Sequence, residues 1–171
     1  GRTLFYRDYP GAEGAATRTP VICLHGLTRN SRDFEEVAPR IAAQGRRVIV
    51  PEMRGRGLSD YSSDSSTYSP PQYVADLEIL FAQLGLDHLI SIGTSMGGLI
   101  TMLLAAAKPG RFEGVLMNDI GPEVDPAGRK RIGGYVGQGK SYPTWMHAAK
   151  SIQSVHGEAF PDWDLDQWLE M

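Results

Sequence analysis

Short apolar runs alternate with longer amphipathic runs along the first 120 residues of the chain. Continuous apolar runs of the kind that form buried strands lie at residues 20–24, 47–50, 88–93 and 112–118. Apolar residues recur at helical spacing over residues 34–41, 73–84 and 96–107. Strands that alternate with helices in this order predict an α/β fold: a mostly parallel sheet with helices on both faces.

The character of the sequence changes after Gly121. Glycine, proline and charged residues crowd residues 125–143, and helical patterns return at residues 144–156 and 164–169. No strand pattern follows. We therefore expect a core domain over residues 1–121 and a separate helical segment over residues 122–171.

Composition excludes several classes of function. The 171 residues contain 17 Lys and Arg against 20 Asp and Glu, so no basic surplus is available to neutralise the phosphates of a nucleic acid. No apolar run approaches the roughly 20 residues of a membrane-spanning helix. The single cysteine, Cys23, excludes a disulfide framework and is typical of a reducing, cytoplasmic setting. No Cys/His spacing indicates a metal site.

One strand-to-helix junction carries a reactive side chain. Residues 93–97 read Gly-Thr-Ser-Met-Gly, which matches the pattern G-x-S-x-G between a buried strand and a helix. A tight turn flanked by glycines lifts the hydroxyl of Ser95 away from the sheet. The helix N-terminus directs free N–H groups at negative charge that develops beside it. The pattern predicts a nucleophile elbow with Ser95 as the nucleophile.

The chain resembles the serine hydrolases of the α/β-hydrolase fold, in particular the lid-bearing esterases. The resemblance rests on His-Gly-Leu at residues 25–27, Arg-Gly-Arg-Gly-Leu-Ser at 54–59, the elbow at 93–98 and Asn-Asp-Ile-Gly-Pro at 118–122. It implies that the chain holds the front portion of the fold without its C-terminal strands, and that a helical lid starts after Gly121. Haloalkane dehalogenases and epoxide hydrolases also resemble this sequence, but they use aspartate where this chain has serine.

The resemblance also implies an oxyanion hole. One donor in this family follows the nucleophile, and the other lies in the loop after the central strand. These positions are the backbone N–H groups of Met96 and Leu27. We expect His25, in the same loop, to order the loop rather than to transfer protons. Neither a cofactor nor a metal ion is expected.

The acid and the base of the catalytic triad are incompletely accounted for. In this family the order is serine, acid, histidine, and the histidine follows the last strand. None of the four histidines, His25, His88, His147 and His156, lies in such a loop. We therefore expect the C-terminal remainder of the protein, in the same or a second chain, to supply it and this chain alone to be inactive. Asp119 is one candidate for the acid, and a residue after the next strand is the other.

A second motif competes with this interpretation. Residues 134–141 match the phosphate-loop pattern G-x-x-x-x-G-K-S. A true phosphate loop follows a buried strand and opens a helix, whereas this one follows a basic run and is followed by Pro143. We interpret it as a flexible segment of the lid.

The sequence thus predicts a cofactor-free serine hydrolase that cleaves an ester or related acyl bond of a small organic substrate through an acyl-enzyme. Two alternatives stay open. The same fold also hydrolyses carbon–carbon bonds or lactones, and it also serves as a sensor that binds a small ligand without turnover.

Overall fold

The computed structural model describes residues 2–12, 18–134, 136–137 and 141–170; the side chains of residues 129 and 131 are outside this description. The chain forms two compact units, Gly1–Asp125 and Pro126–Met171. The first unit contains the sheet, and it is described first.

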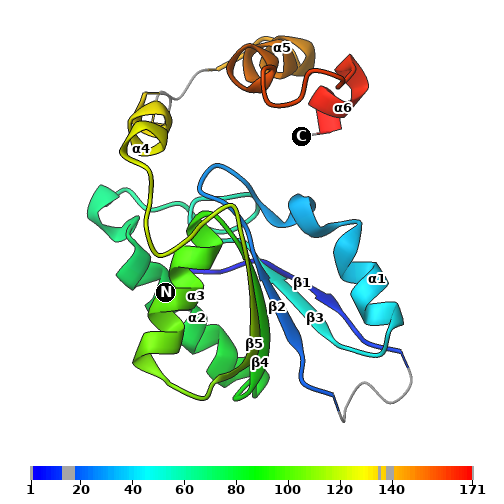
Figure 1. Ribbon diagram of the computed structural model, residues 1–171, viewed down its shortest axis with the longest axis vertical. Helices are drawn as coiled ribbons and strands as arrows, with labels where there is room; N and C mark the ends of the chain where they lie inside the picture. The colour runs from blue at the N-terminus through cyan, green and yellow to red at the C-terminus, as the bar shows by residue number, and fades with distance from the viewer. Residues whose placement is uncertain (1, 13–17, 135, 138–140, 171) are drawn as a thin grey trace. The chain divides into compact units, whose positions relative to one another are not determined.

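The first unit is built on a five-stranded sheet with the strand order β1-β3-β2-β4-β5 (Figure 1). The strands are β1 (Tyr6–Tyr9), β2 (Val21–Leu24), β3 (Val48–Pro51), β4 (Leu89–Thr94) and β5 (Phe112–Asn118). The pairings β2–β3, β2–β4 and β4–β5 are parallel, whereas β1 runs antiparallel to β3. The mostly parallel α/β sheet predicted from the sequence is confirmed.

Strand β1 is the one strand of this sheet that the sequence analysis did not predict. It has four residues, Tyr-Arg-Asp-Tyr, and pairs with all of β3. Its charged residues break the apolar run that marks a buried strand. On an edge strand such charges are favourable because they discourage pairing with another chain. Asp8 is bonded through both carboxylate oxygens to Arg47, at 3.0 and 2.7 Å.

Helices cover both faces of the sheet (Figure 1). The helical elements of the first unit are η2 (Ser31–Phe34), α1 (Val37–Ala43), η3 (Ser65–Thr67), α2 (Pro70–Leu84) and α3 (Met96–Ala107). Alternate residues of a strand point to opposite faces, so the sheet separates two hydrophobic clusters. Ile22 and Ile49 pack in the cluster that contains α2 and α3 residues, whereas Val21 and Val48 pack in the cluster that contains α1 residues.

The start of the first helical region differs from the sequence prediction. The sequence pattern predicted a single helix around residues 34–41, whereas the structure has a short 3₁₀ helix, η2, before α1. Asn30 caps η2 by accepting a hydrogen bond from the Arg32 amide at 2.9 Å. The hydroxyl of Ser31 instead points inward and donates to Glu52 at 2.7 Å. A buried carboxylate partner therefore outweighs the local capping role of this serine.

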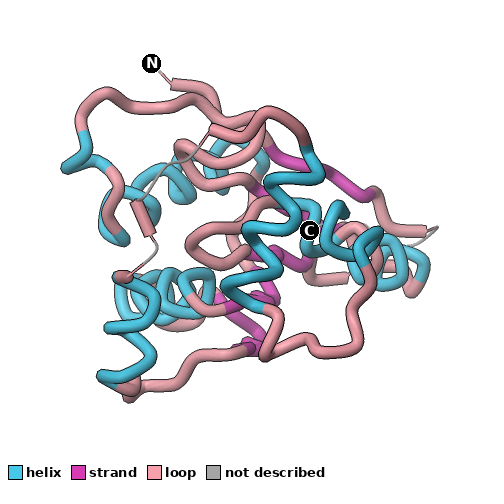
Figure 2. Tube along the Cα trace, turned by 90° about the horizontal axis from the view of Figure 1, so that it is seen from above, coloured by secondary structure: helices cyan, strands magenta, loops and turns pink. Residues whose placement is uncertain are grey.

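The second unit contains helices and loops, with no strand among its described residues (Figure 2). Its helices are α4 (Pro126–Gly133), α5 (Trp145–His156) and α6 (Leu165–Glu170). The last two agree closely with the sequence prediction, whereas α4 lies in the glycine- and proline-rich stretch where no helix was predicted. Phe160, Trp163 and Trp168 stack together at centroid distances of 4.4 to 6.1 Å and bury Trp168. Among the described residues, no helix has the length and apolar character needed to cross a membrane.

Candidate active site

Ser95 occupies a strained turn between β4 and α3. Its backbone angles are φ 49° and ψ −110°, a region that residues with a side chain rarely adopt. Its amide donates to the carbonyl of Asn118 at 2.9 Å, and its carbonyl accepts from the amides of Gly98 and Leu99 at 3.0 and 3.1 Å. The side chain is only partly buried. The backbone is therefore held on both sides of a residue that is only partly buried.

Glycines make this turn possible because backbone groups crowd it. A Cβ atom at Gly93 would lie 2.6 Å from the carbonyl carbon and oxygen of Gly97. A Cβ atom at Gly97 would lie 2.1 Å from the carbonyl oxygen of Leu24 on β2. One at Gly98 would lie 2.3 Å from a methyl carbon of Ile120. Because these distances at Gly93 and Gly97 are to backbone atoms that cannot move aside, the turn requires glycine at both positions, whereas a side chain at Gly98 would displace the Ile120 side chain.

The loop after β2 lies against the same turn. A Cβ atom built on Gly26 would be 3.9 Å from the Cβ of Ser95, so the two backbones are neighbours. The amides of Leu27 and Met96 flank this contact, and within the described part of the chain neither N–H group has a hydrogen-bond acceptor. Free amides beside a serine hydroxyl are the groups that can stabilise an oxyanion.

His25 is fully buried and has backbone partners at both ring nitrogens. Its Nε2 accepts a hydrogen bond from the amide of Met53 at 3.0 Å, and its Nδ1 lies 2.7 Å from the carbonyl oxygen of Gly26. These two contacts assign the neutral tautomer with hydrogen on Nδ1. Burial lowers the pKa of His25 below its ordinary value of 6.5. The ring joins the loop after β2 to the residues that follow β3, a contact consistent with the expected role of His25 in ordering its loop.

Glu52 is a buried carboxylate that the sequence analysis missed. It follows β3 and is 3% exposed. One carboxylate oxygen accepts from the amide and the hydroxyl of Ser31, at 3.2 and 2.7 Å, and the other accepts from the amide of Leu58 at 2.5 Å. Glu52 therefore ties the loop after β2 to the loop after β3. The signal available in the sequence was an acidic residue placed directly after a continuous apolar strand.

Asp119 follows β5 and is exposed, with a φ of 55°. The preceding residue, Asn118, holds the Ser95 amide through its carbonyl oxygen, and its side-chain amide donates to the hydroxyl of Thr94 at 3.4 Å. Asp119 thus lies at the same end of the sheet as Ser95, one residue beyond a direct contact with it. The structure brings together Ser95, Met96, the Leu27 loop and the segment that bears Asp119.

The other histidines lie elsewhere. His88 is exposed and directly precedes β4, at the end of that strand opposite Ser95. His147 and His156 belong to α5 in the second unit, where the hydroxyl of Thr144 lies 2.8 Å from Nδ1 of His147. Among the described residues of the first unit, no histidine is therefore both exposed and at the Ser95 end of the sheet.

Half of the phosphate-loop pattern at residues 134–141 lies outside the described residues, since Tyr135 and residues 138–140, including its lysine, are not described. Cys23 is buried in β2, and burial raises the pKa of its thiol to about 12. A thiol of that pKa is not a nucleophile near neutral pH. Within the described residues, no group of three or more His, Cys, Asp or Glu side chains is placed to hold a metal ion.

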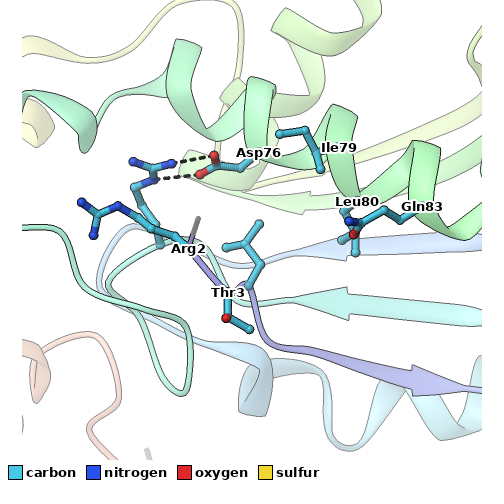
Figure 3. A pocket seen from close by; sticks show the side chains of 8 residues that line it. Arg2, Thr3, Asp76, Ile79, Leu80 and Gln83 are labelled. Carbon is cyan, nitrogen blue, oxygen red and sulfur yellow. Dashed lines mark hydrogen bonds and ion pairs between the residues drawn. The ribbon is translucent and has the colours of Figure 1, made fainter.

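A pocket of about 320 Å³ lies between the N-terminal segment and α2 (Figure 3). Its walls include Thr3, Leu80 and the buried ion pair of Arg54 with Asp76, whose two hydrogen bonds measure 2.8 and 2.6 Å. None of the predicted catalytic or oxyanion residues lines it. The pocket is therefore separate from the Ser95 turn.

Comparison with known proteins gives consistent matches. The family model for the alpha/beta hydrolase fold matches residues 19–166. A 3-hydroxybutyrate-oligomer hydrolase of Cupriavidus necator is 37% identical over 151 residues, which are 88% of this chain and 51% of that protein. The sn-1-specific diacylglycerol lipase ABHD11 of Mus musculus is 36% identical over 116 residues, which are 67% of this chain and 37% of that protein.

The crystal structure of an alpha/beta hydrolase from Novosphingobium aromaticivorans superposes with a TM-score of 0.91 at 55% sequence identity. The match covers 99% of this chain and 58% of that one. The chain thus spans about half the length, or less, of the curated relatives it matches.

Proposed function

The chain belongs to the α/β hydrolase fold family, and from that premise we propose that it forms the nucleophile-bearing half of a serine hydrolase. Ser95 attacks the carbonyl carbon of an ester or related acyl bond and forms an acyl-enzyme, which water then hydrolyses. The observation that carries this proposal is the strained, only partly buried serine at φ 49°, held by backbone bonds between β4 and α3. Strain of this kind persists at functional sites because the surrounding structure enforces it.

The oxyanion of the tetrahedral intermediate accepts hydrogen bonds from the backbone N–H groups of Leu27 and Met96. Both amides are free of other acceptors among the described residues and flank the Ser95 turn. Donors fixed in advance need no reorganisation as charge develops, and each such donor typically contributes about 3 kcal/mol to lowering the barrier. No cofactor or metal ion is required for this chemistry.

A histidine from the C-terminal remainder of the protein accepts the proton of the Ser95 hydroxyl and later returns it to the leaving group. His25 cannot accept this proton in this arrangement. Its Nε2 already accepts a hydrogen bond from the Met53 amide, and its Nδ1 carries the hydrogen that is donated to the Gly26 carbonyl oxygen. Asp119 is our candidate for the carboxylate that orients the incoming imidazole, since it adjoins the residue that holds the Ser95 amide. The alternative is a carboxylate in the same remainder.

An ester is the substrate class we favour. The two relatives described above are named for 3-hydroxybutyrate oligomers and diacylglycerol, and both of these are carboxylic esters. An ester also needs only the serine, the oxyanion donors and a general base. Hydrolysis of a carbon–carbon bond or a lactone uses the same nucleophile, and ligand sensing uses none of this chemistry.

The test compares Ser95→Ala with Ser91→Ala in the full-length protein. Ser91 lies on the same strand, but it is fully buried and its hydroxyl is hydrogen-bonded to that of Thr101 at 2.8 Å. With p-nitrophenyl butyrate and with a 3-hydroxybutyrate dimer, Ser95→Ala should lose turnover by at least about 10³-fold, and Ser91→Ala should keep it. Equal turnover in Ser95→Ala and wild type would refute the proposal. Stabilisation by a ligand without turnover in the wild type would favour the sensor.

A further inference from the structure

The segment that follows β3 holds residues 25–31 at three points. His25 bonds the amide of Met53, Ser31 bonds the carboxylate of Glu52, and the carbonyl oxygen of Leu27 accepts from Arg56. We infer that Arg56 is a positioning residue for the hydrolysis: it fixes the peptide that follows Leu27 and so keeps the Leu27 N–H in place beside the oxyanion. This inference rests on the proposed function.

The guanidinium of Arg56 is itself held in one orientation. Its Nε donates to the Leu27 carbonyl at 3.0 Å, while Nη1 donates to the Arg54 carbonyl at 2.9 Å and to the Tyr73 hydroxyl at 3.0 Å. Its central carbon lies 5.8 Å from the ring centroid of Tyr68 and 5.5 Å from that of Tyr73. Apart from the loop contact, two hydrogen bonds and two rings hold this planar group, so it has little freedom left to lose when it bonds to the Leu27 carbonyl.

The backbone around Arg56 is fixed as well. Its amide donates to the Met53 carbonyl at 3.0 Å, and its own carbonyl accepts from the Ser59 amide at 3.0 Å. Gly55 and Gly57, on either side, have φ values of 71° and 52°. A Cβ atom at Gly57 would lie 2.0 Å from a Glu52 carboxylate oxygen, so this loop closes tightly on Glu52. The motif Arg-Gly-Arg-Gly-Leu-Ser thus forms a rigid support from which Arg56 reaches the neighbouring loop.

The contact matters because Leu27 offers its amide and its carbonyl in different directions. The carbonyl is tied to Arg56, and the side chain packs against the core cluster. The Leu27 N–H belongs to the preceding peptide, whose Gly26 carbonyl oxygen lies 2.7 Å from Nδ1 of His25 and accepts from the Arg29 amide at 3.2 Å. Arg56 holds the following peptide, so both peptides that meet at the Leu27 Cα atom are anchored. Without Arg56 the following peptide is free to move, and the Leu27 N–H shifts relative to Ser95. A donor that points away from the reacting atom leaves substrate binding intact but stabilises the transition state less.

The experiment replaces Arg56 with methionine in the full-length protein, which keeps an unbranched apolar chain but removes every donor. Arg47→Met is the matched control, because Arg47 is also a half-exposed arginine with a two-bond partner, Asp8, on the far edge of the sheet. We expect kcat of Arg56→Met with p-nitrophenyl butyrate to fall by about 10- to 100-fold with KM within about twofold of wild type. Added guanidinium ion should restore part of kcat, and Arg47→Met should show neither effect.

Two milder variants keep the test decisive if Arg56→Met does not fold. Tyr73→Phe removes only the hydroxyl that holds Nη1, and Arg56→Lys keeps the charge but loses the planar fork. Both should lower kcat more than they change KM, and both should increase amide exchange over residues 26–30 relative to residues 89–94. Unchanged kcat in these variants, in a protein that Ser95→Ala inactivates, would overturn the role of Arg56. Turnover that survives in Ser95→Ala would instead overturn the proposed function.

Discussion

The two sides of the Ser95 turn are built differently. On the side of β2 and β3 every strand residue is buried, and the loops that follow are joined by His25 and Glu52. On the side of β5 the sheet is open: Val115 and Leu116 are 54% and 53% exposed, and Asp119 is exposed. The candidate oxyanion donor Leu27 comes from this packed side, Met96 comes from the turn itself, and the candidate acid comes from the open side.

This difference separates two requirements of catalysis. Stabilising a negative charge needs donors that are already fixed, and the contacts within this chain fix them. Moving a proton needs a base within hydrogen-bond reach of the serine, and the first unit offers none among its described residues. We propose that the open side is completed by the rest of the protein.

The largest expected effect lies on the open side. If Asp119 orients the catalytic histidine, Asp119→Asn in the full-length protein should lower kcat by about 10³- to 10⁴-fold, because the amide no longer stabilises the imidazolium. Steady-state hydrolysis of p-nitrophenyl butyrate measures this. Glu113→Gln, an exposed carboxylate at the other end of β5, serves as the control. Near-normal turnover in Asp119→Asn would place the acid in the C-terminal remainder.

Two glycine substitutions compare the sides directly. Gly97→Ala places a Cβ 2.1 Å from the Leu24 carbonyl oxygen, so it should lower the free energy of unfolding by at least about 3 kcal/mol. Gly114→Ala on β5 meets nothing within 4 Å and should change it by no more than about 1 kcal/mol. Urea unfolding of both variants measures the difference. Similar losses in the two variants would mean that the sides are equally packed.

A valine pair tests the same contrast without backbone strain. Val50→Ala on β3 removes two methyl groups from a site with no exposure and should cost about 2 kcal/mol. Val115→Ala on β5 should cost less than about 0.5 kcal/mol, because its side chain is 54% exposed. Thermal unfolding gives both values. A cost at Val115 equal to that at Val50 in the full-length protein would indicate that another segment covers β5 there.

The smallest effect concerns pH and the packed side. His25 is buried as the neutral ring, and its pKa is lowered, first of all by burial. Below pH 6.5 the unfolded chain takes up a proton that the folded chain does not, so stability falls as pH decreases from 6.5 towards the lowered pKa. One proton contributes at most about 1.4 kcal/mol per pH unit. Urea midpoints of wild type and His25→Gln between pH 8 and 5 should differ in slope, and equal slopes would refute this.

Most strands and helices could be predicted from the sequence because the patterns that mark them are local. The runs at β2, β3, β4 and β5 are continuous and apolar, and the helical spacing before and after them is regular. Strand β1 and helix α4 were missed for the opposite reason. Tyr6–Tyr9 carries two charges and Pro126–Gly133 is rich in glycine and charge, so neither shows the periodicity of its element.

The residues of the candidate site also differ in whether a local sequence pattern marks them. The G-x-S-x-G pattern marked Ser95 because the turn needs small residues at fixed spacing. Glu52 and Arg56 gave no comparable signal, since each acts on a loop about 20 to 30 residues earlier in the chain. Their partners, Ser31 and Leu27, become neighbours only when β2 and β3 pair in parallel.

The sequence alone determined where a strained serine would lie and which type of sheet would carry it, because steric limits on a tight turn and the burial of apolar runs are properties of adjacent residues. Only the tertiary structure decided which buried polar groups hold the loops around that serine. A buried carboxylate, imidazole or guanidinium must find its hydrogen-bond partners wherever the chain brings them, and that depends on the packing of the whole sheet.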